Sequence, residues 1–243
     1  MKDSLLSIPI YGSIAAPIHA LNIDKKLSEI AVSVPGSTSL LREYDLDFCC
    51  GGSDTLANAA AEKGLNLAEI ETRLTELQNS KAENPEEYWV NATYPEIIDH
   101  ILVRYHQRHR EQLQELIVLA DRVESVHGDR EDCPIGVAAE LRNVYEDLSN
   151  HMMKEEHVLF PMIKAGNYMM AQMPIRMMEM EHAEHGEHLE VLKSLTNNMT
   201  PPADACNTWR ALYSGIQEFA DDLMMHIHRE NNILFPRVIA ENH

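Results

Sequence analysis

The sequence predicts an all-α protein in which a small helical domain precedes an up-down four-helix bundle. The clearest observation is a repeat, since residues 151–161 and 226–236 both read H-x-x-x-E-[E/N]-x-[V/I]-L-F-P. A matched histidine stands upstream of each copy, at His106 and His182. These two histidines are 76 residues apart, and the first histidines of the two copies are 75 residues apart. Apolar residues recur around these motifs at helical spacing. The chain beyond about residue 94 is therefore a repeated pair of helices, which can close into a bundle.

Composition limits the functions that the chain can have. It has 243 residues, enough for a small and a medium domain, and a formal net charge of −19 at pH 7. Phosphate binding needs a cationic face, so this charge argues against a nucleic-acid partner and against an anionic membrane surface. No apolar run approaches the length of a membrane span. The four cysteines fit reduced thiols better than a disulfide framework.

The chain opens with an N-terminal extension, residues 1–26, that is expected to be irregular. Its mildly apolar start is interrupted by Asp3, Pro9 and Pro17, whereas a signal peptide has a basic start and an unbroken apolar core. We therefore expect a cytoplasmic protein.

Residues 27–78 predict the small helical domain. A short apolar-periodic helix over 27–34 leads to a second helix that begins at Pro35. Ser53 and Asn66 are suited to cap the first turns of two further helices.

Two adjacent cysteines, Cys49 and Cys50, lie in this domain within the string DLDFCCGG, which begins at Asp45. The two glycines allow a tight turn that leaves the thiols accessible, and this favours a redox or metal role. The alternative is a pair of small residues that merely fills the turn. Asp45 and Asp47 would oppose thiolate formation, so the sequence leaves both interpretations open.

A polar stretch over residues 79–93 is interpreted as the linker to the bundle, which occupies residues 94–243. Pro161 and Pro236 lack an N–H and are expected to end or kink the second and fourth helices just past the repeated motif. Periodicity and prolines place the four helices at about 94–126, 134–164, 174–195 and 203–240.

Each repeated motif sets a histidine and a glutamate four residues apart, on one face of a helix and one turn from each other. Imidazole suits iron and carboxylates can bridge two hard cations, so the motif is typical of a metal site in a bundle core. The alternative is an internal hydrogen-bond network, but burying two carboxylates without cations is costly. Both glutamates are expected to bridge two metals that each hold two histidines. The predicted ligands are His106, His151, Glu155, His182, His226 and Glu230.

Other side chains near the motifs have less specific assignments. Glu181 and Asp147 are expected to orient ligands or to line a polar entry path, with a solvated surface as the alternative. The methionine pairs at 152–153, 177–178 and 224–225 resemble a copper-binding motif, but core packing around the site is the preferred interpretation.

The remaining bundle histidines are not assigned as ligands. His109 and His185 follow His106 and His182 by three residues, which is also a neighbouring spacing on a helix. Four histidines are expected to rotate away from the centre: His157, His185, His188 and His228.

A lone histidine followed by H-x-x-x-E, twice over on four helices, resembles the hemerythrin-like domain. The string DLDFCCGG resembles the short N-terminal domain found with it, so residues 27 to 241 together resemble the YtfE/ScdA family of di-iron proteins. The family's iron ligands fall on the six residues already predicted. Oxygen-carrying hemerythrins have a second histidine on the third helix where this chain has Gly186. Its absence leaves a more open iron and favours chemistry or iron release over oxygen carriage.

The resemblance implies a bacterial stress protein that repairs iron–sulfur clusters damaged by nitric oxide or oxidants. It implies two non-haem iron ions, bridged by carboxylates and, when oxidised, by an oxo or hydroxo group. Iron–sulfur proteins would be clients, and NO would be the small-molecule partner. Two routes stay open, which are reduction of NO to nitrous oxide by a di-iron nitric oxide reductase and donation of iron without turnover. The alternative is a hemerythrin-like module that binds or senses dioxygen or NO.

Cys49 and Cys50 are candidates for moving electrons or handing over iron in such a protein. The sequence does not identify the electron donor, and it leaves open a homodimer formed through the small domain.

Overall fold

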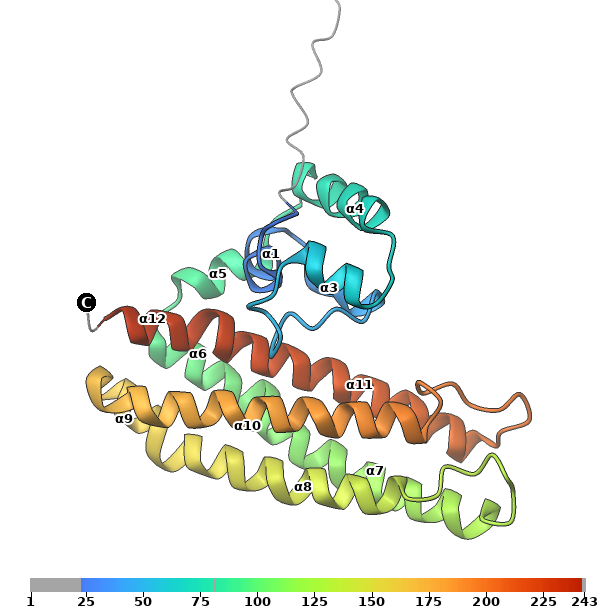
Figure 1. Ribbon diagram of the computed structural model, residues 1–243. Helices are drawn as coiled ribbons and strands as arrows, with labels where there is room; N and C mark the ends of the chain where they lie inside the picture. Colours follow the sequence, from blue (N-terminus) through green and yellow to red (C-terminus); the bar gives the residue numbers. More distant parts are fainter. Residues whose placement is uncertain (1–22, 81, 242–243) are drawn as a thin grey trace, which may run out of the picture.

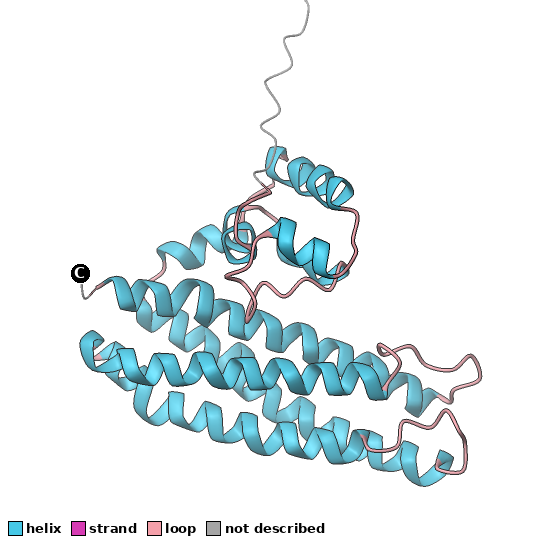
Figure 2. Cartoon of the chain, viewed as in Figure 1, coloured by secondary structure: helices cyan, strands magenta, loops and turns pink. Residues whose placement is uncertain are grey.

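The structure is a computed structural model that describes residues 23–80 and 82–241. Within these residues the regular elements are all helices, and the only extended pairing is one bridge between Lys26 and Thr55 (Figure 2). The all-α prediction is confirmed. Four long helical rods lie side by side, and a small helical unit sits against one side of them (Figure 1). Most of the predicted extension, residues 1–22, lies outside the described residues.

Four short helices make up the small unit, and buried apolar side chains such as Leu27 and Phe48 close its core. Thr55 and Asn66 begin the third and fourth helices, because their side chains accept backbone amide hydrogen bonds of 3.2 and 3.4 Å. Asn66 is thus the predicted cap, whereas Thr55 takes the place predicted for Ser53. The helices are α1 (Leu27–Ser33), α2 (Ser37–Glu43), α3 (Leu56–Glu62) and α4 (Leu67–Asn79).

The stretch predicted as a linker contains a further helix, α5 (Pro85–Asn91). Asn84 caps it by accepting from the backbone of its first turn. The Trp89 ring lies on His100, with 4.1 Å between centroids, and beneath the Arg229 guanidinium at 4.8 Å. This segment therefore packs on the bundle instead of crossing to it as a free connection.

The four rods of the bundle run close to the predicted spans, and each rod except the third is interrupted by a π-helical segment. Figure 1 shows them in chain order from green to red. The first rod is α6 (Tyr94–His100), η1 (Ile101–His106) and α7 (Gln107–His127). The second is α8 (Val137–Lys154), η2 (Glu155–Leu159) and α9 (Phe160–Lys164), and the third is α10 (Tyr168–Leu195). The fourth is α11 (Asn207–Arg229), η3 (Glu230–Leu234) and α12 (Phe235–Ala240).

The three π segments fall where the predicted ligands lie. η1 ends at His106, while η2 and η3 begin at Glu155 and Glu230. A π turn bonds each residue to the fifth one along, so it turns the following side chains away from the α-helical direction. Pro161 and Pro236 stand two residues after the ends of η2 and η3, in the first turns of α9 and α12. The rods continue past both prolines, so the expected breaks are local changes of helix type.

The third rod differs from its prediction at its start. α10 begins at Tyr168, and Pro174 lies inside it instead of opening it. Proline removes one helical hydrogen bond, but the preceding turn is anchored because the Tyr168 ring packs on Tyr94, with centroids 5.5 Å apart. Packing against the first rod therefore outweighs the local signal.

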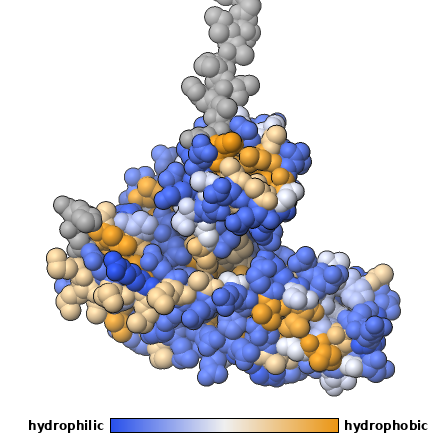
Figure 3. All heavy atoms as spheres, in the orientation of Figure 1, coloured by the Kyte–Doolittle hydropathy of each residue, from blue (hydrophilic) through white to orange (hydrophobic). Residues whose placement is uncertain are grey.

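The structure also corrects the prediction that the paired methionines pack in the core. Met178 is buried and fills the core as expected, but Met177 is 53% exposed. Steps of three and four residues carry other methionines along the same outer face. Figure 3 shows pale orange side chains on this part of the surface. The exposed methionines of α10 are Met169, Met170, Met173, Met177 and Met180, and Met153 is exposed on α8.

Large side chains such as Trp209 fill the bundle interior, while Phe160 and Phe235 stack on the rings of His106 and His182, with centroids 5.8 and 6.0 Å apart. Gly215 lets α11 approach α7, because a Cβ there would lie 2.7 Å from a Leu116 methyl group. Among the described helices, none combines the length and the apolar character that a membrane crossing needs.

Candidate metal centre

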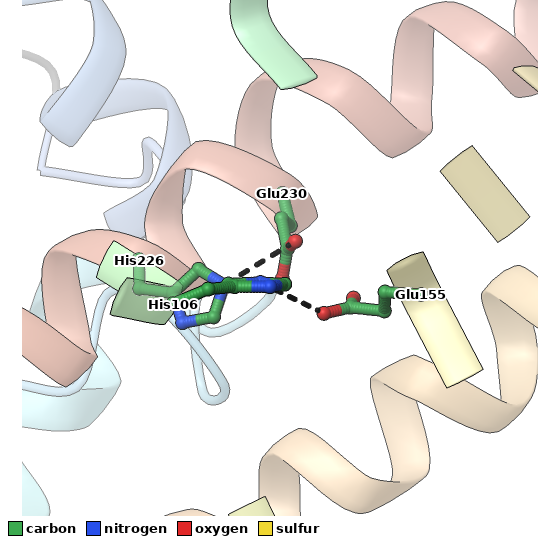
Figure 4. Close-up of side chains that lie close together, drawn as sticks. All are labelled: His106, Glu155, His226 and Glu230. Carbon is green, nitrogen blue, oxygen red and sulfur yellow. Dashed lines mark hydrogen bonds and ion pairs between the residues drawn. The ribbon is translucent and has the colours of Figure 1, made fainter. Parts of the chain in front are cut away.

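Six buried side chains from all four rods meet inside the bundle. They are the six that the repeat predicts as ligands, and each is at most 1% exposed. Figure 4 shows four of them converging from three rods. The set is His106, His151, Glu155, His182, His226 and Glu230.

The six side chains form two overlapping groups in which the potential ligand atoms lie within 4.8 Å of one another. Each group takes one lone histidine and one histidine from a repeated motif. Both glutamates belong to both groups, so each is placed between the two. One group adds His106 and His226 to the glutamates, and the other adds His151 and His182.

Hydrogen bonds on the outer side of three imidazoles fix their orientation. His106 Nδ1 lies 2.8 Å from a Glu156 carboxylate oxygen, and His182 Nδ1 lies 2.8 Å from the Asn231 amide oxygen. His151 Nδ1 lies 3.0 Å from Glu181. Each oxygen is an acceptor, so each Nδ1 carries the proton and each Nε2 turns a lone pair toward the centre.

The inner atoms fit metal ions better than they fit one another. The Nε2 atoms of His106 and His226 are 3.2 Å apart, and those of His151 and His182 are 3.1 Å apart. Two lone pairs at that distance repel unless a proton or a cation lies between them. The carboxylate oxygens of Glu155 and Glu230 are also buried and lack hydrogen-bond partners. Imidazole nitrogens and carboxylate oxygens are the donor set that iron, zinc and manganese accept.

Electrostatics support the same conclusion for the glutamates. Burial, together with the neighbouring charge of Glu230, holds the pKa of Glu155 well above its usual range. Two carboxylates in one dry site cannot both remain charged without cations. A pair of divalent ions would remove this restriction and keep both groups ionised.

Comparisons with known proteins agree with this geometry. Residues 97–238 match the model of the hemerythrin HHE cation-binding domain, and residues 23–78 match ScdA_N, a domain of unknown function. A probable iron–sulfur cluster repair protein of Haemophilus influenzae is 69% identical over 217 residues, which are 89% of this chain and 97% of that protein. The iron–sulfur cluster repair protein YtfE of Musicola paradisiaca is 55% identical, over 89% of this chain and 96% of its own.

The chain belongs to the YtfE family of iron–sulfur cluster repair proteins. A YtfE of Escherichia coli O81 shows the same relation, with 56% identity over 89% of this chain and 97% of its own. The resemblance drawn from the motifs is thereby confirmed.

The two halves of the centre in this YtfE family member are not equivalent. Glu181, which accepts from His151, precedes His182 by one residue. The equivalent position in the first repeat, directly before His106, is Tyr105. Tyr105 cannot accept in the same way and instead stacks on His226, with centroids 5.4 Å apart. His226 Nδ1 therefore has no hydrogen-bond partner. A hydrogen-bonded imidazole is a more basic ligand, so the two groups would bind a metal ion with different strength.

The expected helpers of the ligands are only partly where the sequence suggests. Glu181 contacts His151, but Asp147 lies 3.1 Å from His188 Nε2 and touches none of the six. Asp147 is exposed because it is on the outer face of α8. Glu156 and Asn231 take corresponding roles that the sequence analysis misses. Their signal is the [E/N] position of the repeated motif, which directly follows each glutamate ligand.

Two histidines outside the six lie closer to the centre than expected. The His185 ring is 4.9 Å from that of His151, and the His109 ring is 5.3 Å from that of His226. The prediction that His185 rotates away is wrong, since three residues beyond His182 is still the buried face of α10. His157 is exposed, and His188 bonds to Glu140 as well as Asp147. His228 is buried, but it faces Phe48 and Glu86.

These buried histidines predict an acid-sensitive metal-free fold. Burial, reinforced by His151, lowers the pKa of His185 to about 2, whereas an unfolded histidine titrates near pH ~6.5. Below that pH the His185 imidazole is protonated in the unfolded chain but stays neutral in the native chain. The free energy of unfolding therefore falls as pH falls. Between pH 7 and 5, we expect His185→Leu to lose about 2 kcal/mol less unfolding free energy than the parent protein loses.

Urea unfolding of the metal-free protein at the two pH values measures this effect. His157→Leu is the matched control, because His157 is exposed. Equal losses in His185→Leu and in the parent protein would show that His185 is protonated in the native state.

The small unit touches the centre through the loop that carries the adjacent cysteines. Cys50 Sγ lies 3.2 Å from the backbone oxygen of the ligand His182. Asn231 donates to the Cys49 carbonyl at 3.0 Å while its oxygen accepts from His182. A Cβ on Gly186 would lie 3.9 Å from Cys50 Sγ, so the thiol covers the bundle beside this glycine.

Proposed function

We propose that the six side chains hold two iron ions and that the protein repairs iron–sulfur clusters damaged by nitrosative or oxidative stress. One observation carries the proposal, which is the convergence of four imidazole Nε2 atoms and two unpartnered carboxylates in a fully buried site. The printed names of the relatives support the biological role.

In this proposal His106 and His226 hold one iron, and His151 and His182 hold the other. Glu155 and Glu230 would each contribute to both ions, since both carboxylates belong to both groups. The residues outside this set orient the rings, and the apolar side chains around them exclude water. An ion in either position has only two imidazoles and the bridging carboxylates, which leaves room for a small ligand.

Two routes to repair follow from this centre. Two adjacent ferrous ions would supply the two electrons that convert two NO and two protons into nitrous oxide and water. Alternatively, the protein would release iron to damaged clusters in client iron–sulfur proteins. Holding two NO molecules side by side turns an encounter into an intramolecular step, which favours the first route. Cys49 and Cys50 would serve electron or iron transfer, and the protein would work in the bacterial cytoplasm.

An anaerobic NO assay tests the first route. The protein is loaded with ferrous iron and exposed to NO, and nitrous oxide in the headspace is compared with that from iron-free protein. Nitrous oxide at about half the NO consumed is expected from the stoichiometry above. Iron loss without nitrous oxide would support donation instead. Stable iron nitrosyls without turnover would support a module that binds or senses NO and would contradict both repair routes.

A further inference from the structure

The loop after α2 gathers three potential metal ligands outside the bundle centre. The Sγ atoms of Cys49 and Cys50 are 3.8 Å apart, and Cys49 Sγ lies 3.2 Å from Asp47 Oδ1. All the ligand atoms lie within 4.8 Å of one another. Neither cysteine is in a disulfide.

We propose that Asp47, Cys49 and Cys50 form a second metal site, which binds a thiophilic divalent ion such as Fe²⁺. The site goes beyond the bundle centre, since it shares no residue with the six. It deepens the iron-donation route and rests on that route for the identity of the ion, but not for the existence of the site.

The spacing of the thiols suits a metal better than it suits a disulfide. Two sulfurs bound tetrahedrally at about 2.3 Å from one ion are about 3.8 Å apart, which matches the separation here. A disulfide would need about 2.05 Å. Between a carboxylate oxygen and a sulfur on the same ion the separation is about 3.6 Å, so Asp47 would move by a few tenths of an ångström.

Asp47 is already held in place to serve as the third ligand. Its Oδ1 accepts from the backbone amides of Cys49 and Cys50 at 3.0 and 2.9 Å, and its Oδ2 accepts from Gly51 at 2.8 Å. These bonds also stabilise the turn when no ion is bound. They use both lone pairs of Oδ1, since each carboxylate oxygen can accept twice, so Oδ1 would give up one amide to bind an ion, whereas Oδ2 keeps one free lone pair. Asp45 is not a competing ligand, because Lys63 and Lys193 each bond to its carboxylate.

The site opens on a cavity and adjoins the bundle centre. The cavity, of about 420 Å³, lies between the small unit and the bundle and is lined by all three ligands and by Gly186. Cys50 is partly exposed, so an ion could reach the thiols from outside. On the inner side the same loop contacts the backbone of His182 and, through Asn231, its imidazole. An ion in this loop would therefore sit beside a ligand of the centre, where iron could be received or passed on.

Binding exchanges protons for the ion. Hydrogen bonding to Cys50 and burial hold the pKa of Cys49 well above its usual range, so Cys49 is a neutral thiol in the metal-free site, and Cys50 donates its thiol hydrogen to the His182 backbone oxygen. The ion forms two metal–sulfur bonds and one metal–oxygen bond, and both thiol protons leave to solvent. No electron is transferred. The fourth position is left to water or to a group on a client protein.

Cobalt(II) titration of the full-length, metal-free protein tests the proposal. Cobalt bound to thiolate gives an intense near-ultraviolet charge-transfer band, and the bundle centre contains no sulfur that could produce it. We expect three cobalt ions per chain and a thiolate band. Cys49→Ser/Cys50→Ser should bind two and lose the band. The matched control Cys133→Ser/Cys206→Ser removes the other two cysteines. It should still bind three cobalt ions and show the thiolate band.

Several outcomes would overturn the site. These are the absence of a thiolate band in the parent protein, or a band that survives Cys49→Ser/Cys50→Ser. Asp47→Asn should weaken cobalt binding at the thiols by about 10-fold or more, and unchanged affinity would remove Asp47 as a ligand. Failure of the bundle centre would look different, because the thiolate band would then appear without the two other cobalt ions.

Discussion

Replacing either buried glutamate of the centre should abolish the proposed di-iron site. In Glu155→Ala or Glu230→Ala we expect no iron or one iron per chain, against two in the parent protein, because each carboxylate is placed to hold both ions. The loss should appear as iron per chain after loading under excess ferrous iron and gel filtration. Glu155→Gln keeps the volume and tests the charge alone, so it should lose iron as well.

The control for this experiment is Glu146→Ala, which removes an exposed carboxylate nine residues earlier on the same rod. It should retain both ions. Two irons in Glu155→Ala or Glu230→Ala would show that the carboxylates do not bridge. Circular dichroism separates iron loss from unfolding, because a folded variant keeps its helical spectrum.

Removing Glu86 should cost the largest amount of stability outside the centre. Glu86 on α5 is buried with Arg229, which bonds to its carboxylate through both terminal nitrogens, and with His228. Truncation leaves the guanidinium buried without a counter-charge, and such a loss costs about 3–5 kcal/mol. We expect Glu86→Ala to lower the unfolding free energy by that amount in urea. It should also weaken iron binding, because Arg229 directly precedes the ligand Glu230 in the chain.

Glu87→Ala is the matched control, since Glu87 is the next residue on α5 and is exposed. It should change stability by less than about 0.5 kcal/mol. The double variant Glu86→Leu/Arg229→Leu removes both charges and should recover much of the loss. A Glu86→Ala protein as stable as Glu87→Ala would mean that water reaches Arg229.

The sequence predicts the bundle and the convergence of the six side chains because both depend on a periodic signal. A four-residue spacing fixes two side chains on one helical face whatever the neighbours are. The repeat then supplies the symmetry that pairs His106 with His182. The departures have non-local causes. Pro174 is tolerated inside α10 because Tyr168 packs on Tyr94, and no local pattern reports such a contact.

The surroundings of the centre are harder to predict for a related reason. Asp147 and Glu181 are both close to ligands in sequence, yet only Glu181 reaches one. Which carboxylate turns inward depends on how neighbouring rods cross. Asn231 links the small unit to the centre, because it bonds to both Cys49 and His182, and these residues are far apart in the chain. The π segments are also absent from the expectation, since periodicity over several turns averages out one extra residue.

The π segments separate the requirements of binding from those of folding. Such a turn holds about one residue more than an α turn, so each is equivalent to a single insertion in an otherwise regular rod. Deleting the exposed His157 would restore a plain helix and would leave Phe160 on its buried face. Glu155 lies before the deletion and its N–H bonds to the His151 oxygen as in a plain α-helix, so it would keep its place one turn from His151. The extra residue in this rod thus sets the course of the helix past the centre, whereas the α-helical turn before it presents His151 and Glu155.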